Sequence, residues 1–165
     1  DRPLHRDGVG FNEQVLVQHC ERPSFTALEP SVPAIFIGAG SGMAGLRGQL
    51  LSRPIGSHNW LIFGERCPDN DRLLADELEQ WLMEGRLQYL SLAFSRHAQK
   101  PTYVQDCLNT HQARLREWLD NGAVLYLCGS LQGLGRSVEQ ELTALLGSNE
   151  LARLKQQGRY KADVY

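Results

Sequence analysis

Short apolar runs alternate with longer amphipathic segments along most of the chain. The apolar runs predict five strands, at residues 34–37, 60–64, 87–94, 123–128 and 160–165. The segments between them predict helices at residues 43–53, from a cap at Asp69 or Asn70 onward, and at residues 104–119, 133–146 and 149–157. Strands joined by helices of about ten or more residues are typical of parallel pairing with right-handed crossovers. The pattern therefore predicts an α/β fold.

Most of the predicted helices carry apolar side chains at helical spacing. After the second strand these side chains are Leu73, Leu74, Leu78, Trp81 and Leu82. In the helix predicted over residues 104–119 we expect Leu108, Leu115 and Leu119 to face inward. The strands are almost wholly apolar, which is typical of a sheet covered on both faces. We therefore expect a doubly wound, mainly parallel five-stranded sheet with helices on both faces, a Rossmann-like arrangement.

Residues 1–33 differ from the rest of the chain. They contain four prolines and one strand-like run, Gln14–Gln18, and they show no helical periodicity. We interpret them as an extended lead-in, the tail of a preceding domain that this chain lacks. Residues 34–165 are expected to form one domain.

Composition narrows the possible partners. The chain has 165 residues, of which 42% are hydrophobic and 22% are charged, and its formal net charge is −2. This ordinary globular balance gives no reason to expect binding to nucleic acid. Because no apolar run approaches the roughly 20 residues that span a bilayer, we expect no membrane segment. Four widely spaced cysteines without a C-x-x-C pair favour reduced thiols in the cytoplasm and indicate no metal site.

Glycine-rich or polar segments follow the first four predicted strands. They are, in order, Gly38–Gly48, Gly64-Glu65-Arg66, Ser95-Arg96 and Gly129-Ser130. The carboxyl ends of parallel strands meet at one edge of a sheet, where ligands bind in folds of this kind. A strand that ends in glycines and then enters a helix lets the backbone come close to a phosphate. The four segments together therefore predict a nucleotide site.

The residues leave two nucleotides open. Gly40–Gly45 matches G-x-G-x-x-G literally, and Glu65 ends the next strand, where an acid binds the ribose hydroxyls of NAD. Alternatively, a hydroxyl, a guanidinium, an ammonium and a phenol lie within nine residues, at Ser95, Arg96, Lys100 and Tyr103. Those groups suit the 2′-phosphate and the adenine of NADP.

Five segments resemble, in order, the motifs of the NADP(H)-binding domain of the ferredoxin–NADP reductase superfamily, in its diflavin reductase and sulfite reductase flavoprotein branch. Gly38–Gly48 is similar to the loop G-x-G-T-G-x-A-P-F-R-G, and Leu61–Arg66 is similar to L-F-F-G-x-R. Ala93–Arg96, followed by Tyr103–Gln105, resembles A-F-S-R…Y-V-Q. Tyr126–Gly129 matches Y-V-C-G, and Arg159–Tyr165 matches R-Y-x-x-D-V-W/Y.

The resemblance implies a role for each matched residue. Gly40, Ser41 and Gly42 would bind the pyrophosphate, Ser95, Arg96, Lys100 and Tyr103 the 2′-phosphate, and Arg66, Gln105 and Gly129 other parts of the cofactor. Three residues inherit catalytic roles: Cys128 beside the nicotinamide, Asp163 as a residue that tunes the same site, and Tyr165 as the cover of the flavin where the nicotinamide enters.

The chain departs from the family pattern at several positions. Gly45 replaces a proline, Ser41 replaces a threonine, and Ser130 replaces an aspartate. Lys100 stands one position early, with Pro101 in the expected lysine place. The flavin-binding motif R-x-Y-S does not occur in the sequence, so we expect most of the FAD site to lie outside this chain.

The resemblance implies an NADP(H)-binding module of a flavoprotein oxidoreductase. The implied cofactors are NADP(H) and, in the parent protein, FAD. The implied partners are an FAD-binding domain and an electron-acceptor protein or domain. The expected location is cytoplasmic, either free or on the cytoplasmic side of a membrane-anchored parent. Two alternatives stay open: the nucleotide domain of an NAD-dependent dehydrogenase that uses Glu65, and a nucleotide-sensing domain without catalysis.

Overall fold

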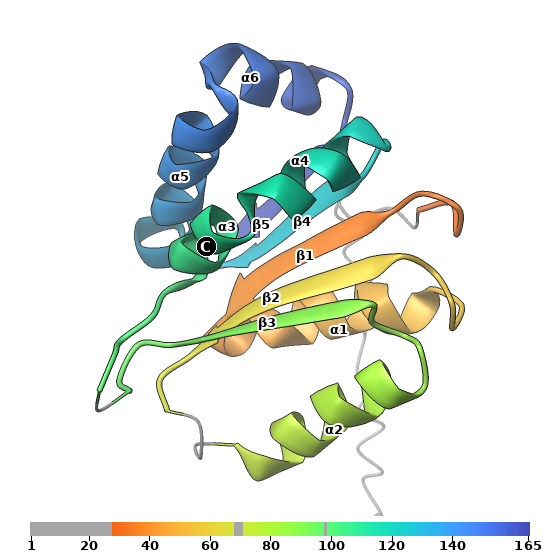
Figure 1. The fold of residues 1–165 in the computed structure, drawn as a ribbon, viewed down its shortest axis with the longest axis vertical. Helices are drawn as coiled ribbons and strands as arrows, with labels where there is room; N and C mark the ends of the chain where they lie inside the picture. The colour runs from red at the N-terminus through yellow and green to blue at the C-terminus, as the bar shows by residue number, and fades with distance from the viewer. Residues whose placement is uncertain (1–27, 68–70, 98) are drawn as a thin grey trace, which may run out of the picture.

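Five parallel strands form one sheet in the computed structural model, which describes residues 28–67, 71–97 and 99–165. The sheet order is β3-β2-β1-β4-β5, and every neighbouring pair is parallel. The strands are β1 (Ala34–Ala39), β2 (Asn59–Glu65), β3 (Tyr89–Phe94), β4 (Val124–Gly129) and β5 (Tyr160–Val164). Their carboxyl ends all point to the left in Figure 1.

Helices cover both faces of this sheet (Figure 1). One face carries α1 (Met43–Ser52) and α2 (Arg72–Met83). The other face carries α3 (Val104–Thr110), α4 (Gln112–Asp120), α5 (Arg136–Leu146) and α6 (Ser148–Gln156). Two short turns precede helices, the 3-10 turn η2 (Gly40–Gly42) before α1 and the π-helical turn η3 (Leu131–Gly135) before α5.

The core has two layers because side chains alternate between the faces of each strand. In β1, Ile35 and Ile37 face α3–α6, whereas Phe36 faces α1 and α2. The Phe36 ring stacks on Tyr126 of β4, with ring centroids 5.2 Å apart. Fully burying a large apolar side chain stabilises the fold by roughly 1.5–3 kcal/mol, so both layers hold the sheet in place. The predicted fold class is confirmed.

The start of α2 differs from the prediction. Asp71 is the cap, because its Oδ1 accepts a hydrogen bond of 2.9 Å from the backbone N–H of Leu74. The predicted caps, Asp69 and Asn70, lie outside the described residues. Two of the apolar side chains at helical spacing, Leu73 and Leu82, lie on the exposed side of α2. The helix buries only one stripe against the sheet, and Leu74, Leu78 and Trp81 fill it.

The single helix predicted over residues 104–119 is two helices. They are interrupted at His111, whose φ of −107° and ψ of 31° are not helical. The interruption is local, because the backbone bonds from His111 to Cys107 and from Leu115 to His111 continue across it. All three predicted inward leucines of this segment are buried.

Other boundaries shift by one or more residues. The third strand begins at Tyr89, two residues later than predicted. The helix predicted from Gly133 begins as the π-helical turn and continues as α5 from Arg136.

The described part of the lead-in packs on this domain. Leu28 and Val32 lie against the core layer under α1 and α2. The buried guanidinium of Arg53 donates to the carbonyl of Val32 at 2.5 Å and to Oδ1 of Asn59 at 2.7 Å. The chain just before β1 is therefore fastened to the amino end of the sheet. The strand-like run Gln14–Gln18 lies outside the described residues, and the domain boundary at residue 34 stays a prediction.

Two glycines of the loop and first helix give a matched test of this packing. A Cβ on Gly42 would overlap the carbonyl group of Cys128, whereas a Cβ on Gly48, in the middle of α1, would meet nothing within 4 Å. We expect Gly42→Ala to lower the free energy of unfolding by roughly 1–3 kcal/mol. We expect Gly48→Ala to raise it by about 1 kcal/mol through helix propensity. Chemical denaturation measures both, and equal effects of the two substitutions would contradict the close approach of Gly42 to β4.

Candidate functional site

A cleft of about 550 Å³ crosses the carboxyl ends of four neighbouring strands, β3, β2, β1 and β4. Its lining comes from the segments that follow those strands, from the start of α3 and from Tyr165, and comprises Ala39–Ser41, Gly64–Arg66, Ala93, Ser95, Thr102–Gln105, Ser130, Gly133, Leu134, Ser137 and Tyr165. The chain leaves β1 toward β2 and β3 on one side and returns to β4 and β5 on the other. The cleft therefore lies where the strand order reverses, the usual ligand site of such sheets.

The glycine loop forms the centre of the cleft. Gly40 has a φ of +55°, a conformation that favours glycine, and a Cβ there would meet nothing within 4 Å. Gly42 is buried and lies against the backbone of Cys128 and Gly129. Helix α1 begins directly after this loop and has no acidic residue in its first turn. The dipole of this helix favours an anion at this point.

The two charged side chains of the lining stand at the end of β2. They are Glu65 and Arg66. Backbone pairing continues past the strands here, because Ser95 N–H donates to the carbonyl of Glu65 at 2.9 Å and Arg96 N–H donates to that of Arg66 at 2.8 Å. Ser95 and Arg66 are thus brought together at one end of the cleft, beside the glycine loop.

Burial raises the pKa of Glu65 above its ordinary value of 4.5, and the negative charge of Asp71 raises it further. Both effects disfavour the carboxylate form. A second negative charge beside Glu65, such as a phosphate of a ligand, would disfavour that form again. The end of the cleft at β2 and β3 therefore combines one guanidinium with a carboxyl group whose pKa is raised.

The segment between β3 and α3 is closed by hydrogen bonds at its base. Thr102 N–H donates to the carbonyl of Phe94, and Phe94 N–H donates to Oγ1 of Thr102, both at 2.9 Å. Helix α3 then starts where the backbone N–H of Tyr103 donates to Oδ2 of Asp106 at 2.7 Å. This start places Tyr103, which is 49% exposed, and Gln105 in the lining of the cleft.

Two predicted phosphate ligands of this segment do not line the cleft. Arg96 and Lys100 are exposed side chains of the segment between Phe94 and Thr102. His97 Nδ1 accepts hydrogen bonds of 3.3 Å from the backbone N–H groups of Gln99 and Lys100, which shapes the turn that carries the lysine. The phosphate contacts of Arg96 and Lys100 stay predictions.

The other end of the cleft, at β4, is built from hydroxyl groups. Tyr165 reaches this end, and its hydroxyl is hydrogen-bonded to Oγ of Ser41 on the glycine loop. Ser130 caps the turn η3 by accepting from the N–H of Gly133 at 3.2 Å, and Ser137 donates to the carbonyl of Gly133 at 2.8 Å. The cleft thus joins a charged end at β2 and β3 to a neutral, hydrogen-bonding end at β4.

Sequence reasoning missed part of this lining. Thr102, Gly133 and Ser137 carry no motif, and Ser130 was predicted only as part of the segment Gly129-Ser130 and not as an individual site residue. Ser130 directly follows an apolar strand, which was the available signal. Ser137 gave no sequence signal. It lies in the first turn of α5, and its place at the cleft depends on the π-helical turn that precedes this helix.

Three predicted site residues lie beneath the cleft or beside it. Cys128 is buried in the core layer under α1, where a Cβ on Gly45 would come within 2.9 Å of its Sγ. Asp163 lies opposite Cys128 in the register of β4 and β5. Neither side chain lines the cleft, and nor does Gly129, which joins β4 to Ser130. Their roles at a nicotinamide stay predictions.

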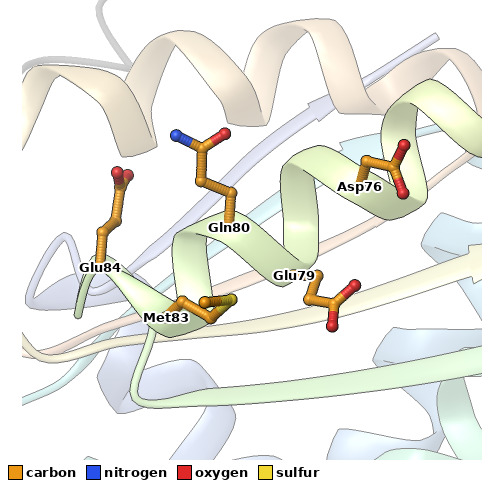
Figure 2. Close-up of a pocket in the computed structure, with 5 residues that line it drawn as sticks. All are labelled: Asp76, Glu79, Gln80, Met83 and Glu84. Carbon is orange, nitrogen blue, oxygen red and sulfur yellow. The ribbon is translucent and has the colours of Figure 1, made fainter.

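A second hollow, on the outer side of α2, does not suit a nucleotide. Figure 2 shows its lining, Asp76, Glu79, Gln80, Met83 and Glu84, in which three carboxylates project from successive parts of one helix. Phosphate groups would be repelled there. Within the described residues, no three histidine, cysteine, aspartate or glutamate side chains gather closely enough to hold a metal ion. None of the described helices is both long and apolar enough to cross a membrane.

Comparison with known proteins agrees with the position of the cleft. Residues 36–140 match the family model of the oxidoreductase NAD-binding domain. The flavoprotein alpha-component of NADPH sulfite reductase from Enterobacter sp. (strain 638) is 34% identical to the chain, over 92% of the chain and 27% of that protein. The components of the same name from Bacillus subtilis (strain 168) and Yersinia pestis are 34% and 33% identical, with the same coverage.

The chain spans about a quarter of the length of these curated relatives. The matched region runs from β1, through the glycine loop and all four strand ends that form the cleft, into α5. The comparisons confirm the resemblance to the ferredoxin–NADP reductase superfamily that the motifs indicated. The chain therefore belongs to the oxidoreductase NAD-binding domain family, whose ligand is a nicotinamide dinucleotide.

Proposed function

We propose that this chain binds NADP(H) in the cleft and presents the nicotinamide to FAD in a flavoprotein reductase. The observation that carries the proposal is the cleft itself, which crosses four strand ends and has chemically different ends. Neighbouring strands lie roughly 4.8 Å apart, so four strands give the cleft the reach of an extended dinucleotide rather than of a single nucleotide.

The proposed orientation follows from the charges. The 2′-phosphate and adenosine would bind at β2 and β3, where Arg66, Ser95 and Tyr103 line the cleft. The pyrophosphate would bind at the glycine loop, against the amino end of α1. The nicotinamide half would then extend toward β4 and Tyr165, where the lining is uncharged.

The parent protein would supply the rest of the reaction. The relatives are named as NADPH-dependent flavoprotein components, and the chain covers only 27% of their length. We therefore propose an FAD-binding domain as the direct partner and an electron-acceptor protein or domain beyond it. The nicotinamide supplies a hydride to a flavin, and the residues of this chain bind the dinucleotide, orient it and exclude water.

The two alternative functions explain fewer observations. A dehydrogenase that holds the ribose of NAD with Glu65 would leave Arg66, Ser95 and Tyr103 in the lining without a ligand group to bind. A nucleotide sensor without catalysis would not need the uncharged end at β4. The family match and the named relatives favour the reductase module over both.

Arg66 offers the first test of the proposed orientation. A charge-assisted hydrogen bond contributes roughly 1.5–3 kcal/mol, so Arg66→Ala should weaken NADP⁺ binding about ten- to a hundredfold and leave NAD⁺ binding nearly unchanged. Arg96→Ala, measured in the same experiment, should also weaken NADP⁺ binding and leave NAD⁺ binding nearly unchanged if the exposed Arg96 side chain contacts the 2′-phosphate. Isothermal titration with both dinucleotides measures these effects.

Two further variants control that experiment. Arg66→Lys keeps the charge but loses the planar fork of the guanidinium, so an intermediate loss is expected. Arg153→Ala removes an exposed guanidinium of α6 that pairs with Glu150 of the same helix, outside the cleft, and should leave both affinities unchanged. Equal losses for NADP⁺ and NAD⁺ in Arg66→Ala would remove the 2′-phosphate from this end of the cleft.

Glu65 separates the reductase module from the dehydrogenase. Removing a negative charge beside the 2′-phosphate should make Glu65→Gln bind NADP⁺ roughly three- to tenfold more tightly at neutral pH. A dehydrogenase that needs Glu65 for the ribose would instead lose NAD⁺ affinity. Burial and Asp71 raise the pKa of Glu65 above 4.5, so the native carboxylate begins to take up a proton above that pH. The NADP⁺ affinity of Glu65→Gln, divided by that of the native protein, should therefore fall toward one as the pH decreases from neutral.

The matched control for this series is Glu79→Gln, which removes an exposed carboxylate of α2 outside the cleft. Its NADP⁺ affinity should follow that of the native protein at every pH. A Glu65→Gln protein that gains no affinity for NADP⁺ at neutral pH would contradict the proposed position of the phosphate.

A further inference from the structure

Two serine hydroxyls at the β4 end of the cleft are fixed to the same residue. Oγ of Ser130 accepts a hydrogen bond of 3.2 Å from the backbone N–H of Gly133, and Oγ of Ser137 donates one of 2.8 Å to the carbonyl of Gly133. All three residues line the cleft. The π-helical turn η3, which contains Gly133, therefore sets the position of both hydroxyls.

These two bonds leave the hydroxyls with opposite capacities. A serine hydroxyl has one proton to donate and two lone pairs with which to accept. Ser130 uses a lone pair and keeps its proton, whereas Ser137 uses its proton and keeps its lone pairs. Neither hydroxyl makes another hydrogen bond within the part of the chain that the structure describes. The pair therefore offers a ligand in the cleft one donor and one acceptor.

The surroundings of the pair are uncharged. Leu134 lines this end of the cleft with an apolar side chain, and the hydroxyls of Ser41 and Tyr165 are hydrogen-bonded to each other. The two charged side chains of the lining stand at the other end, at β2. An apolar wall with one donor and one acceptor suits a flat, neutral ring that carries a group able both to accept and to donate.

We propose that Ser130 and Ser137 bind the carboxamide of the nicotinamide ring and so set which way round the ring lies in the cleft. The carbonyl oxygen of a primary carboxamide accepts hydrogen bonds, and its NH₂ group donates them. The free proton of Ser130 meets the carbonyl oxygen, and the lone pairs of Ser137 meet the NH₂ group. This inference rests on the proposed function, which places the nicotinamide half at β4.

The pairing makes the cleft selective for the group on the ring. A ring with a carboxylate in this place would offer only acceptors, so Ser137 would have to give up its bond to Gly133 in order to donate. A ring with an acetyl group keeps the carbonyl oxygen but has no N–H to donate. The two serines therefore respond to different parts of one group, and a ligand that lacks only the NH₂ group separates them.

The test compares NADP⁺ with its 3-acetylpyridine analogue, in which a methyl group replaces the NH₂ group, by isothermal titration on the full chain. One neutral hydrogen bond is worth roughly two- to tenfold in an equilibrium constant, and the native protein should prefer NADP⁺ by that factor. Ser137→Ala should weaken NADP⁺ binding by the same factor and leave the analogue unchanged, so that the preference is lost. Ser130→Ala should weaken both ligands, because both carry the carbonyl oxygen.

Conservative variants and a matched control separate this role from a structural one. Ser130 also caps the turn η3, and Ser130→Thr keeps both the capping oxygen and the proton, so it should retain the affinity for both ligands. Ser137→Thr should retain the preference for NADP⁺. Ser52→Ala is the matched control, because Ser52 also donates to a carbonyl of its own helix, that of Gln49 at 2.7 Å, but lies outside the cleft. It should change neither affinity.

The carboxamide assignment is overturned if the native protein binds NADP⁺ and the analogue equally well, or if Ser130→Ala leaves both affinities unchanged. It is also overturned if Ser137→Ala keeps the preference. Equal losses for both ligands in Ser137→Ala would assign this hydroxyl to a group that the ligands share, such as a ribose hydroxyl. In each of these cases NADP⁺ still binds and the proposed function stands. Failure of the native protein to bind NADP⁺ would instead reject the proposed function and this inference with it.

Discussion

The close approach of Gly42 to the carbonyl group of Cys128 is the constraint on which the site depends. Strands β1 and β4 are paired up to Gly38 and Cys128, so the chain that leaves β1 must pass directly over the end of β4. Only a residue without a Cβ fits there. The approach places the amino end of α1 at the reversal of the strand order, and the polar groups of the other strand ends gather around that point.

The cleft relies on fixed dipoles and hydroxyl groups more than on net charge. Among its described lining residues, Glu65 and Arg66 carry opposite charges side by side. The remaining attraction for a phosphate comes from the helix end and from groups that donate hydrogen bonds. Protonation of Glu65, whose pKa is raised by burial and by Asp71, would therefore change the balance of charge at the β2 end of the cleft.

Several local features were beyond prediction for identifiable reasons. Asp69, Asn70 and Asp71 are all able to cap a helix, and the choice of Asp71 is set by the phase that buries Leu74 against the sheet. Cys128 follows the pattern of a strand end near the ligand, but a strand pattern does not show which face a side chain takes. Here the Cys128 side chain packs against Gly45 on the α1 side. The interruption at His111 left the apolar spacing on either side intact and so gave no signal.

The sequence by itself determined the α/β fold, the parallel sheet and the four strand ends at which the cleft is found. It did so because apolar runs, helical periodicity and glycine spacing are local properties of the chain. Only the tertiary structure decided which side chains meet in the cleft. The bond between Ser41 and Tyr165 and the pairing of Glu65 with Ser95 join residues that are distant in sequence. Strand order and register bring these residues together, and both are set by how the two core layers pack.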